Sequence, residues 1–185
     1  MNVLQTPAAT NFRTAVRAYC AHVESRQSIS PAVWLPRVHV LLVELYAAGL
    51  QLPSIEPGSE NANPEYESQG DWQRLFDDFG QAFGRWNAYR LVFDPYDTEE
   101  TEALYGSLAD DFAEIFGDVR RGELHENERG DAFPNDVMWE WRFAFESHWS
   151  RHATSALNAL GSLQFQQYAT AMPESFGTWT GASAT

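Results

Sequence analysis

This chain contains no lysine: the 12 residues counted as Lys or Arg are all arginine. This absence excludes the chemistries that need a lysine amine: Schiff-base catalysis, a Ser-x-x-Lys nucleophile and the lysine of a phosphate-binding loop. The sequence also lacks a Gly-x-Ser-x-Gly turn and a glycine-rich phosphate loop. The candidate functional residues considered below are therefore acidic residues and histidines.

Cysteine is nearly absent as well. Cys20 stands alone, so the chain cannot form an intrachain disulfide or a cysteine-rich zinc cluster. It falls in the apolar stripe of the first predicted helix. That position favours a buried, inert thiol over a nucleophile.

The sequence shows no targeting segment of the usual kinds. Its first residues, MNVLQTPAATNF, contain no basic stretch followed by an apolar run, so we do not expect a signal peptide. No apolar run reaches the length that we expect of a bilayer span. These two observations predict a cytoplasmic protein.

Positive charge is scarce relative to negative charge. The chain of 185 residues carries 26 acidic residues, and its formal net charge is −14. A phosphate backbone or an anionic membrane surface would be repelled, so we expect neither nucleic acid nor membrane as a partner. The hydrophobic fraction of 44% is nevertheless high enough for a folded core.

What the sequence has in abundance is helical periodicity. Apolar residues recur every three to four positions in five segments, which predicts an all-α, mostly antiparallel bundle of about five helices. We expect a single helical domain over residues 1–170, with a long surface loop at about 53–70 and a mobile C-terminal tail over 171–185. The predicted helices start near residue 10 and at residues 31, 71, 99 and 135.

The clearest helical period lies in residues 99–121. Leu104, Leu108, Phe112, Ile115 and Val119 share one face of the predicted helix. We expect this helix to end at Gly122, followed by a polar loop over 122–135. The segment 31–50 is apolar almost all round, which predicts a helix buried at the centre of the bundle.

Several stretches resemble one known family. They are RAYCAHVES, a leucine-rich run ending at Pro53, YRLVFDP, SLADDFAEIFGDVRRG and FESHWSRHATSALNAL. In this order they resemble a bacterial all-helical family catalogued as a domain of unknown function, the DUF5063-type family, over most of residues 12–163. The resemblance implies a compact helical protein of the bacterial cytoplasm. It implies no reaction and supplies no catalytic residues.

The predicted helix 99–121 carries an acidic stripe. Spaced carboxylates on a helix are suitable oxygen ligands for divalent metals, and Asp-Asp-x-x-Glu is similar to the pattern of helical nucleotide pyrophosphohydrolases. Such enzymes need a second acidic pair on a facing helix, which Asp77 and Asp78 or Glu140 would have to supply. The alternative is an ordinary solvated face of an acidic protein. The stripe consists of Asp110, Asp111, Glu114 and Asp118.

His148 and His152 lie four residues apart and can share one side of the last helix. The run ESHWSRH lacks the His-Glu-x-x-His order of zinc enzymes, so hydrogen-bonded boundary histidines are the alternative. With Glu146 they could join the acidic stripe in a mixed carboxylate–imidazole metal site. We predict that no specific transition metal is bound. Arg142, on the same helix, is expected to pair with Asp111 or Glu146.

The function that these features favour is a non-enzymatic cytoplasmic binding or protein-interaction module, with an unknown protein partner and no cofactor. The alternative is a metal-dependent hydrolase acting on a nucleotide-like phosphate through the acidic helix face. No catalytic residue can be assigned from the sequence, and the oligomeric state stays open.

Overall fold

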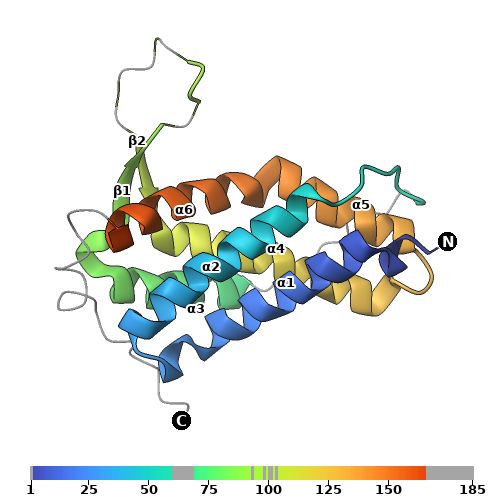
Figure 1. The fold of residues 1–185 in the computed structure, drawn as a ribbon, viewed down its shortest axis with the longest axis horizontal. Coiled ribbons are helices and arrows are strands. Elements are labelled where there is room, and N and C mark those ends of the chain that lie inside the picture. The colour runs from blue at the N-terminus through green and yellow to red at the C-terminus, as the bar shows by residue number, and fades with distance from the viewer. Residues whose placement is uncertain are drawn as a thin grey trace.

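The computed structural model describes residues 2–59, 69–92, 94–97, 99, 102 and 104–165, without the side chains of 69–71. Within these residues the fold is all-α, with one two-stranded antiparallel ribbon (Figure 1). The α-helices are α1 (Pro7–Glu24), α2 (Pro31–Leu50), α3 (Gln69–Phe83), α4 (Leu108–Arg129), α5 (Pro134–Ala144) and α6 (Ser150–Phe165). The strands are β1 (Ala88–Leu91) and β2 (Leu104–Ser107). Short helical turns are η1 (Val3–Gln5), η2 (Ser25–Ser28), η3 (Gly84–Trp86) and η4 (Phe145–Trp149).

Helix α4 is the centre of the bundle. It packs against α1, α3, α5 and α6. Phe112, Ile115 and Val119 are buried on it, and Phe112 stacks on Phe79 and Phe83 of α3. One continuous cluster of buried side chains draws on all six α-helices.

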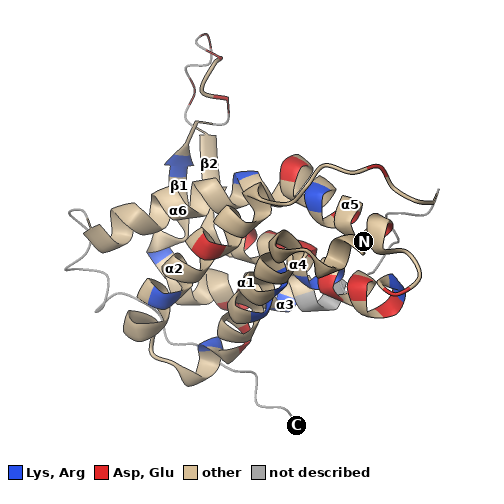
Figure 2. Ribbon diagram, turned by 45° about the vertical axis from the view of Figure 1, so that its right-hand side comes forward, with Lys and Arg blue, Asp and Glu red and all other residues tan. Residues whose placement is uncertain are grey.

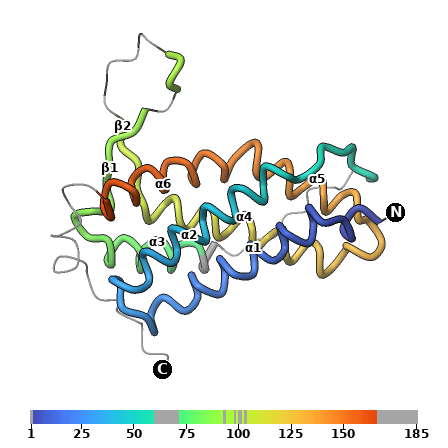
Figure 3. Tube along the Cα trace, in the orientation of Figure 1, coloured from blue at the N-terminus to red at the C-terminus, as the bar shows by residue number. Residues whose placement is uncertain are grey.

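Helices α5 and α6 form one continuous rod, because η4 between them is a π-helical turn (Figure 3). Counted this way, the described chain has five helical rods, as predicted. The π-turn holds one more residue per turn than an α-helix and so rotates the faces of α6 relative to α5. Phe145 and Trp149, at the two ends of the π-turn, are buried in contact with each other.

The start and end predicted for the central helix were wrong. Residues 104–107 are a strand, and α4 begins at Leu108, where the Ser107 side chain accepts a hydrogen bond from the Asp110 N–H. The helix then continues through Gly122 to Arg129, and His125 is buried in it, not placed in a loop. Gly122 is required by packing, because a Cβ there would lie 2.8 Å from Trp141 Cδ1.

Helix α2 has the predicted bounds but not the predicted place. It packs against α1 and α6 at the surface, while Val33, Val40, Val43 and Leu50 stay exposed. By length and composition α2 could cross a membrane, which corrects the expectation that no run is long enough. Its other face, which includes Trp34 and Leu42, is buried in the bundle core. A core helix of a globular protein can be equally long and apolar.

Helix α1 begins at Pro7, before the predicted start near residue 10, and residues 2–6 include side chains packed on the core. Leu4 is buried, and the Thr6 side chain caps α1 by accepting from the Ala9 N–H. Of the loop predicted at 53–70, residues 53–59 run without regular structure, and Gly58 and Ser59 donate hydrogen bonds to buried Asp136. Residues 60–68 of that loop and the tail predicted at 171–185 lie outside the described residues.

Candidate functional site

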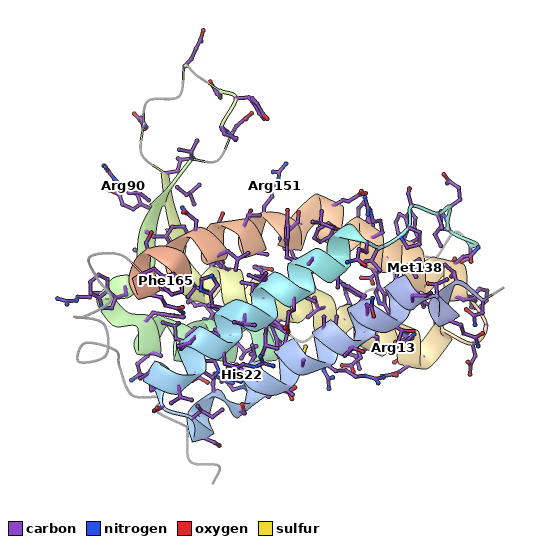
Figure 4. All side chains as sticks on the ribbon, viewed as in Figure 1. Arg13, His22, Arg90, Met138, Arg151 and Phe165 are labelled. Carbon is purple, nitrogen blue, oxygen red and sulfur yellow. The ribbon has the colours of Figure 1, made fainter. Side chains whose placement is uncertain are left out.

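A cleft of about 770 Å³ lies at the base of the β1–β2 ribbon. The ribbon stands away from the bundle (Figure 1) and forms one wall with apolar and aromatic side chains. The opposite wall comes from the first turns of α4 and from η4 and α6, and it is polar. Arg151 projects from α6 on the side of the ribbon (Figure 4). The cleft therefore has two chemically different walls.

The first polar group of the cleft is centred on Asp111. One of its carboxylate oxygens lies 3.0 Å from His152 Nδ1, and the other accepts a 2.5 Å hydrogen bond from the Tyr89 hydroxyl. The Asp111 side chain is only 5% exposed, so these two donors stabilise its charge. Asp110, the next carboxylate, lies 3.9 Å from the same His152 nitrogen and is 41% exposed.

The second polar group is centred on Asp118, two turns further along α4. One carboxylate oxygen lies 2.7 Å from His148 Nδ1, and the other accepts a 2.8 Å hydrogen bond from Arg121. Glu114 lies 4.0 Å from the other ring nitrogen of His148. The two imidazole rings contact each other edge to face, with centroids 5.0 Å apart. The acidic stripe and the histidine pair thus meet in space.

Burial and hydrogen bonding shift the pKa values of these groups. The hydrogen bond to Asp118 raises the pKa of His148, despite opposing burial, so this ring is a stronger base than an ordinary histidine. Burial raises the pKa of Asp111, while the bonds from His152 and Tyr89 oppose that rise. Burial, followed by the neighbouring Asp111 carboxylate, raises the pKa of Tyr89. The neighbouring carboxylates therefore favour the protonated form of the His148 ring.

The hydrogen bonds define the protonation pattern of the two rings. Each Nδ1 faces a carboxylate, so in the neutral ring Nδ1 carries the proton and Nε2 is left as the acceptor. Asp110, Asp111 and His152 can each offer a ligand atom, and these atoms lie within 4.8 Å of one another. The site has the donor types for a transition metal, but a metal on His152 Nδ1 would have to displace the Asp111 hydrogen bond.

Other candidate residues lie outside these groups. Glu146 pairs with Arg142 along the helix, and Arg142 also donates to the Leu52 carbonyl. The predicted pairing of Arg142 with Glu146 is confirmed, whereas Asp111 has other partners. The second acidic pair that a hydrolase needs was expected at Asp77 and Asp78 of α3 or at Glu140. Asp78 pairs with Arg26, and the exposed Asp77 accepts a hydrogen bond from Gln73 of its own helix.

Glu140 does lie near the acidic stripe, because Arg121 binds both Glu140 and Asp118, and Glu140 is buried there. Its pKa is raised to about 7 by burial, which the Arg121 charge only partly offsets.

Tyr89 and Arg121 belong to the site, and the sequence did not single them out. Tyr89 lies on strand β1 and lines the cleft. Arg121 lies inside α4, where it binds Asp118. The π-turn that carries His148 was not foreseen, although such turns often mark functional sites.

The chain matches the family model DUF5063, described as a domain of unknown function, over residues 4–166. The crystal structure of protein BF1032 from Bacteroides fragilis is similar in fold, with a TM-score of 0.74 at 16% sequence identity. The similarity covers 88% of this chain and 96% of that one. At this identity the likeness concerns the fold alone. No curated protein matches the sequence.

Proposed function

The chain belongs to the DUF5063 family of domains of unknown function, and we propose that it is a non-enzymatic protein-interaction module of the bacterial cytoplasm. Its ligand is a basic segment of a partner protein. The segment docks on the arm, by which we mean β1, β2 and the described residues between them, and reaches into the cleft at the base of the arm. The surface of the arm carries this proposal.

The arm exposes large apolar and aromatic side chains. Tyr96 is 90% exposed, Val92 74% and Tyr105 71%. Aromatic side chains are enriched at the centres of protein interfaces, because they bury a large area at a small loss of conformational entropy. Three large exposed side chains on one projecting element, two of them tyrosines, are an unusual concentration for a surface with no partner.

The arm is also acidic. The described residues between its strands include four exposed carboxylates and no basic residue, and Figure 2 shows them in red at its far end. With a chain net charge of −14, this surface attracts basic segments and repels acidic ones. The four residues are Asp94, Asp97, Glu99 and Glu102.

The cleft supports binding in preference to catalysis. The buried Asp111, which lines the cleft, already accepts hydrogen bonds from Tyr89 and His152. Asp118, which does not line the cleft itself, accepts from Arg121 and from the cleft residue His148. Carboxylates held in this way fix the shape of the polar wall. Asp110 remains half open to the cleft and can accept a hydrogen bond from a partner's arginine or lysine.

Affinity capture from the host lysate tests the proposal. The bait chain should retain a partner at low salt and release it at high salt, because the attraction is screened. The exposed variants Tyr96→Ala with Tyr105→Ala, and Asp94→Asn with Asp97→Asn, should each lose that partner. The matched control is Asp131→Asn, another exposed carboxylate, located after α4 and away from the arm. A partner retained equally by all four baits would contradict the proposal.

The second candidate is a metal-dependent hydrolase acting on a nucleotide-like phosphate. One observation favours it, the clustering of the ligand atoms of Asp110, Asp111 and His152. Elemental analysis of protein purified without a tag or chelator separates the two functions. The interaction module is expected to contain no near-stoichiometric transition metal. A metal that disappears in the His148→Ala, His152→Ala double variant would make the hydrolase the better proposal.

A further inference from the structure

The outward face of α2 carries a continuous apolar stripe. Its members face away from the buried side of α2, which packs on α1 and α6. Val33 is 64% exposed, Val40 48%, Val43 49% and Leu50 58%. The α2 stripe consists of Val33, Pro36, Val40, Val43, Ala47 and Leu50, all of them exposed.

The spacing of the stripe is that of a coiled-coil seam. Its members follow one another at intervals of three, four, three, four and three residues, which keeps them on one line along the helix. The sequence of the stripe is also symmetric about its midpoint, between Val40 and Val43. All its members are apolar, and they stand at mirror positions: Val33 and Leu50 at the ends, Pro36 and Ala47 next inside, and Val40 and Val43 at the centre.

We infer that the α2 stripe binds the same stripe of a second copy of this chain, with the two helices antiparallel. In this arrangement Val40 lies opposite the partner's Val43, and Val33 opposite the partner's Leu50. Pro36 then faces the partner's Ala47, whose small side chain leaves room for the proline ring. A two-fold axis requires such self-complementarity of a surface, and the stripe has it over its whole length.

The charges beside the stripe fit the same arrangement. Arg37 and Glu44 are exposed on one flank, and neither forms an ion pair within the described part of the chain. Seven residues, or about 10 Å along the helix, separate them, which is too far for a pair within one chain. Antiparallel packing about the midpoint brings Arg37 to within about 3 Å, along the axis, of the level of the partner's Glu44. Two symmetric ion pairs result, one on each side of the midpoint.

A contact limited to one helix from each chain is small. It falls near the lower limit of specific interfaces, about 1,000 Å² of total buried surface. We therefore expect a reversible dimer with a dissociation constant on the order of micromolar. The surface involved shares no residue with the lining of the cleft, so a dimer would present two independent clefts.

Sedimentation velocity of the full chain over about 1 to 300 µM covers that range of affinity. The mass should rise with concentration from the 20.9 kDa monomer towards twice that value. Val40→Glu should weaken association at least tenfold without lowering the melting temperature of the monomer, because Val40 is exposed. The matched control is Val92→Glu, at an exposed valine of the arm, which should associate like the wild type.

A charge exchange tests the antiparallel pairing itself. Arg37→Glu and Glu44→Arg should each weaken the dimer, because each places like charges beside each other. The double variant Arg37→Glu, Glu44→Arg should restore association to within about threefold of the wild type, since about 1 kcal/mol or less per exposed pair is at stake. A double variant as dissociated as the single ones would overturn the pairing.

Three other results would overturn the inference, and the last two of them would assign the stripe another role. A chain that stays monomeric throughout has no such dimer. A monomeric chain that sediments with zwitterionic phosphatidylcholine vesicles uses the stripe on a membrane. If the chain is monomeric and the Val40→Glu substitution lowers its melting temperature, then another part of the same chain covers the stripe.

Discussion

Arg142 contacts two acceptors of different kinds. Its guanidinium binds the Glu146 carboxylate, which is 54% exposed, and donates a 2.7 Å hydrogen bond to the Leu52 carbonyl, just after the end of α2. The bond to Leu52 crosses between two segments far apart in the sequence. The pair with Glu146 lies within one helix and near solvent, where ion pairs contribute little.

We expect Arg142→Ala to lower the free energy of unfolding by about 1 to 2 kcal/mol, because the Leu52 carbonyl loses a charged donor. Glu146→Ala should change it by less than about 0.5 kcal/mol, which makes it the matched control. Urea denaturation of both variants provides the measurement. Equal losses of unfolding free energy in the two variants would show that the ion pair with Glu146, and not the contact with the Leu52 carbonyl, provides the stabilisation.

Glu140 should make stability depend on pH. Its pKa is about 7 in the folded chain, above its ordinary value of 4.5, because it is buried. Between these two values the folded state holds a proton that the unfolded state has lost. Stability therefore falls as pH rises from 4.5 to 7, and the full loss persists above 7.

Glu140→Gln removes this titration. We expect the variant to gain stability relative to the wild type at pH 8, by up to about 3 kcal/mol, and to gain much less at pH 5. Thermal denaturation at both pH values measures the difference. The control is Glu24→Gln, at an exposed position on α1, which changes the net charge equally. A gain that is the same at both pH values would mean that Glu140 is ionised throughout.

Sequence patterns identified the chemical groups of the site but not their partners. The acidic stripe of Asp110, Asp111, Glu114 and Asp118 was predictable because helical spacing is a local property. Which histidine meets which aspartate depends on how α6 crosses α4, and the π-turn at 145–149 sets that rotation. Such a turn has no reliable local signature, so the sequence could not predict these contacts.

At the scale of elements, helix boundaries failed where two local signals competed. Leu104 and Leu108 continue the helical period of residues 99–121, yet residues 104–107 pair with 88–91 as a strand. Ser107 is the stronger signal, because its side chain caps α4. Similarly, the apolar run of α2 predicted burial on most faces. Composition cannot tell a buried face from one left exposed at the surface.

Gly49 of α2 is a contact point between elements. A Cβ at this position would lie 2.7 Å from Phe145 Cδ2 and 3.1 Å from Trp149 Cη2, both in the rigid π-turn. We expect Gly49→Ala to destabilise the chain by about 1 to 3 kcal/mol, since buried aromatic rings cannot move aside cheaply.

Gly117→Ala is the matched control for this substitution. Gly117 lies in α4 with nothing within 4 Å of its added Cβ, and alanine there should stabilise the helix by about 1 kcal/mol. The two variants should thus shift the melting temperature in opposite directions. A stabilised Gly49→Ala variant would show that α2 can move away from the π-turn.

At the scale of the whole molecule, the net charge of −14 opposes the compact state. At 0.01 M salt the screening length is about 30 Å, comparable to the molecule, so all the excess carboxylates repel one another. At 0.15 M it is about 8 Å, and only neighbouring charges interact. Exposed ion pairs such as Arg120–Glu123 are weakened too, but they contribute little to begin with.

We therefore expect the melting temperature at pH 8 to rise when sodium chloride is increased from about 0.01 M to about 0.15 M, the range over which screening changes most. The same titration close to the isoelectric point of about 4.6 is the control, because the excess charge is then small and salt should have little effect. Differential scanning fluorimetry at low protein concentration keeps self-association from contributing. A melting temperature that falls with salt at pH 8 would mean that ion pairs across the helices outweigh the repulsion among the carboxylates.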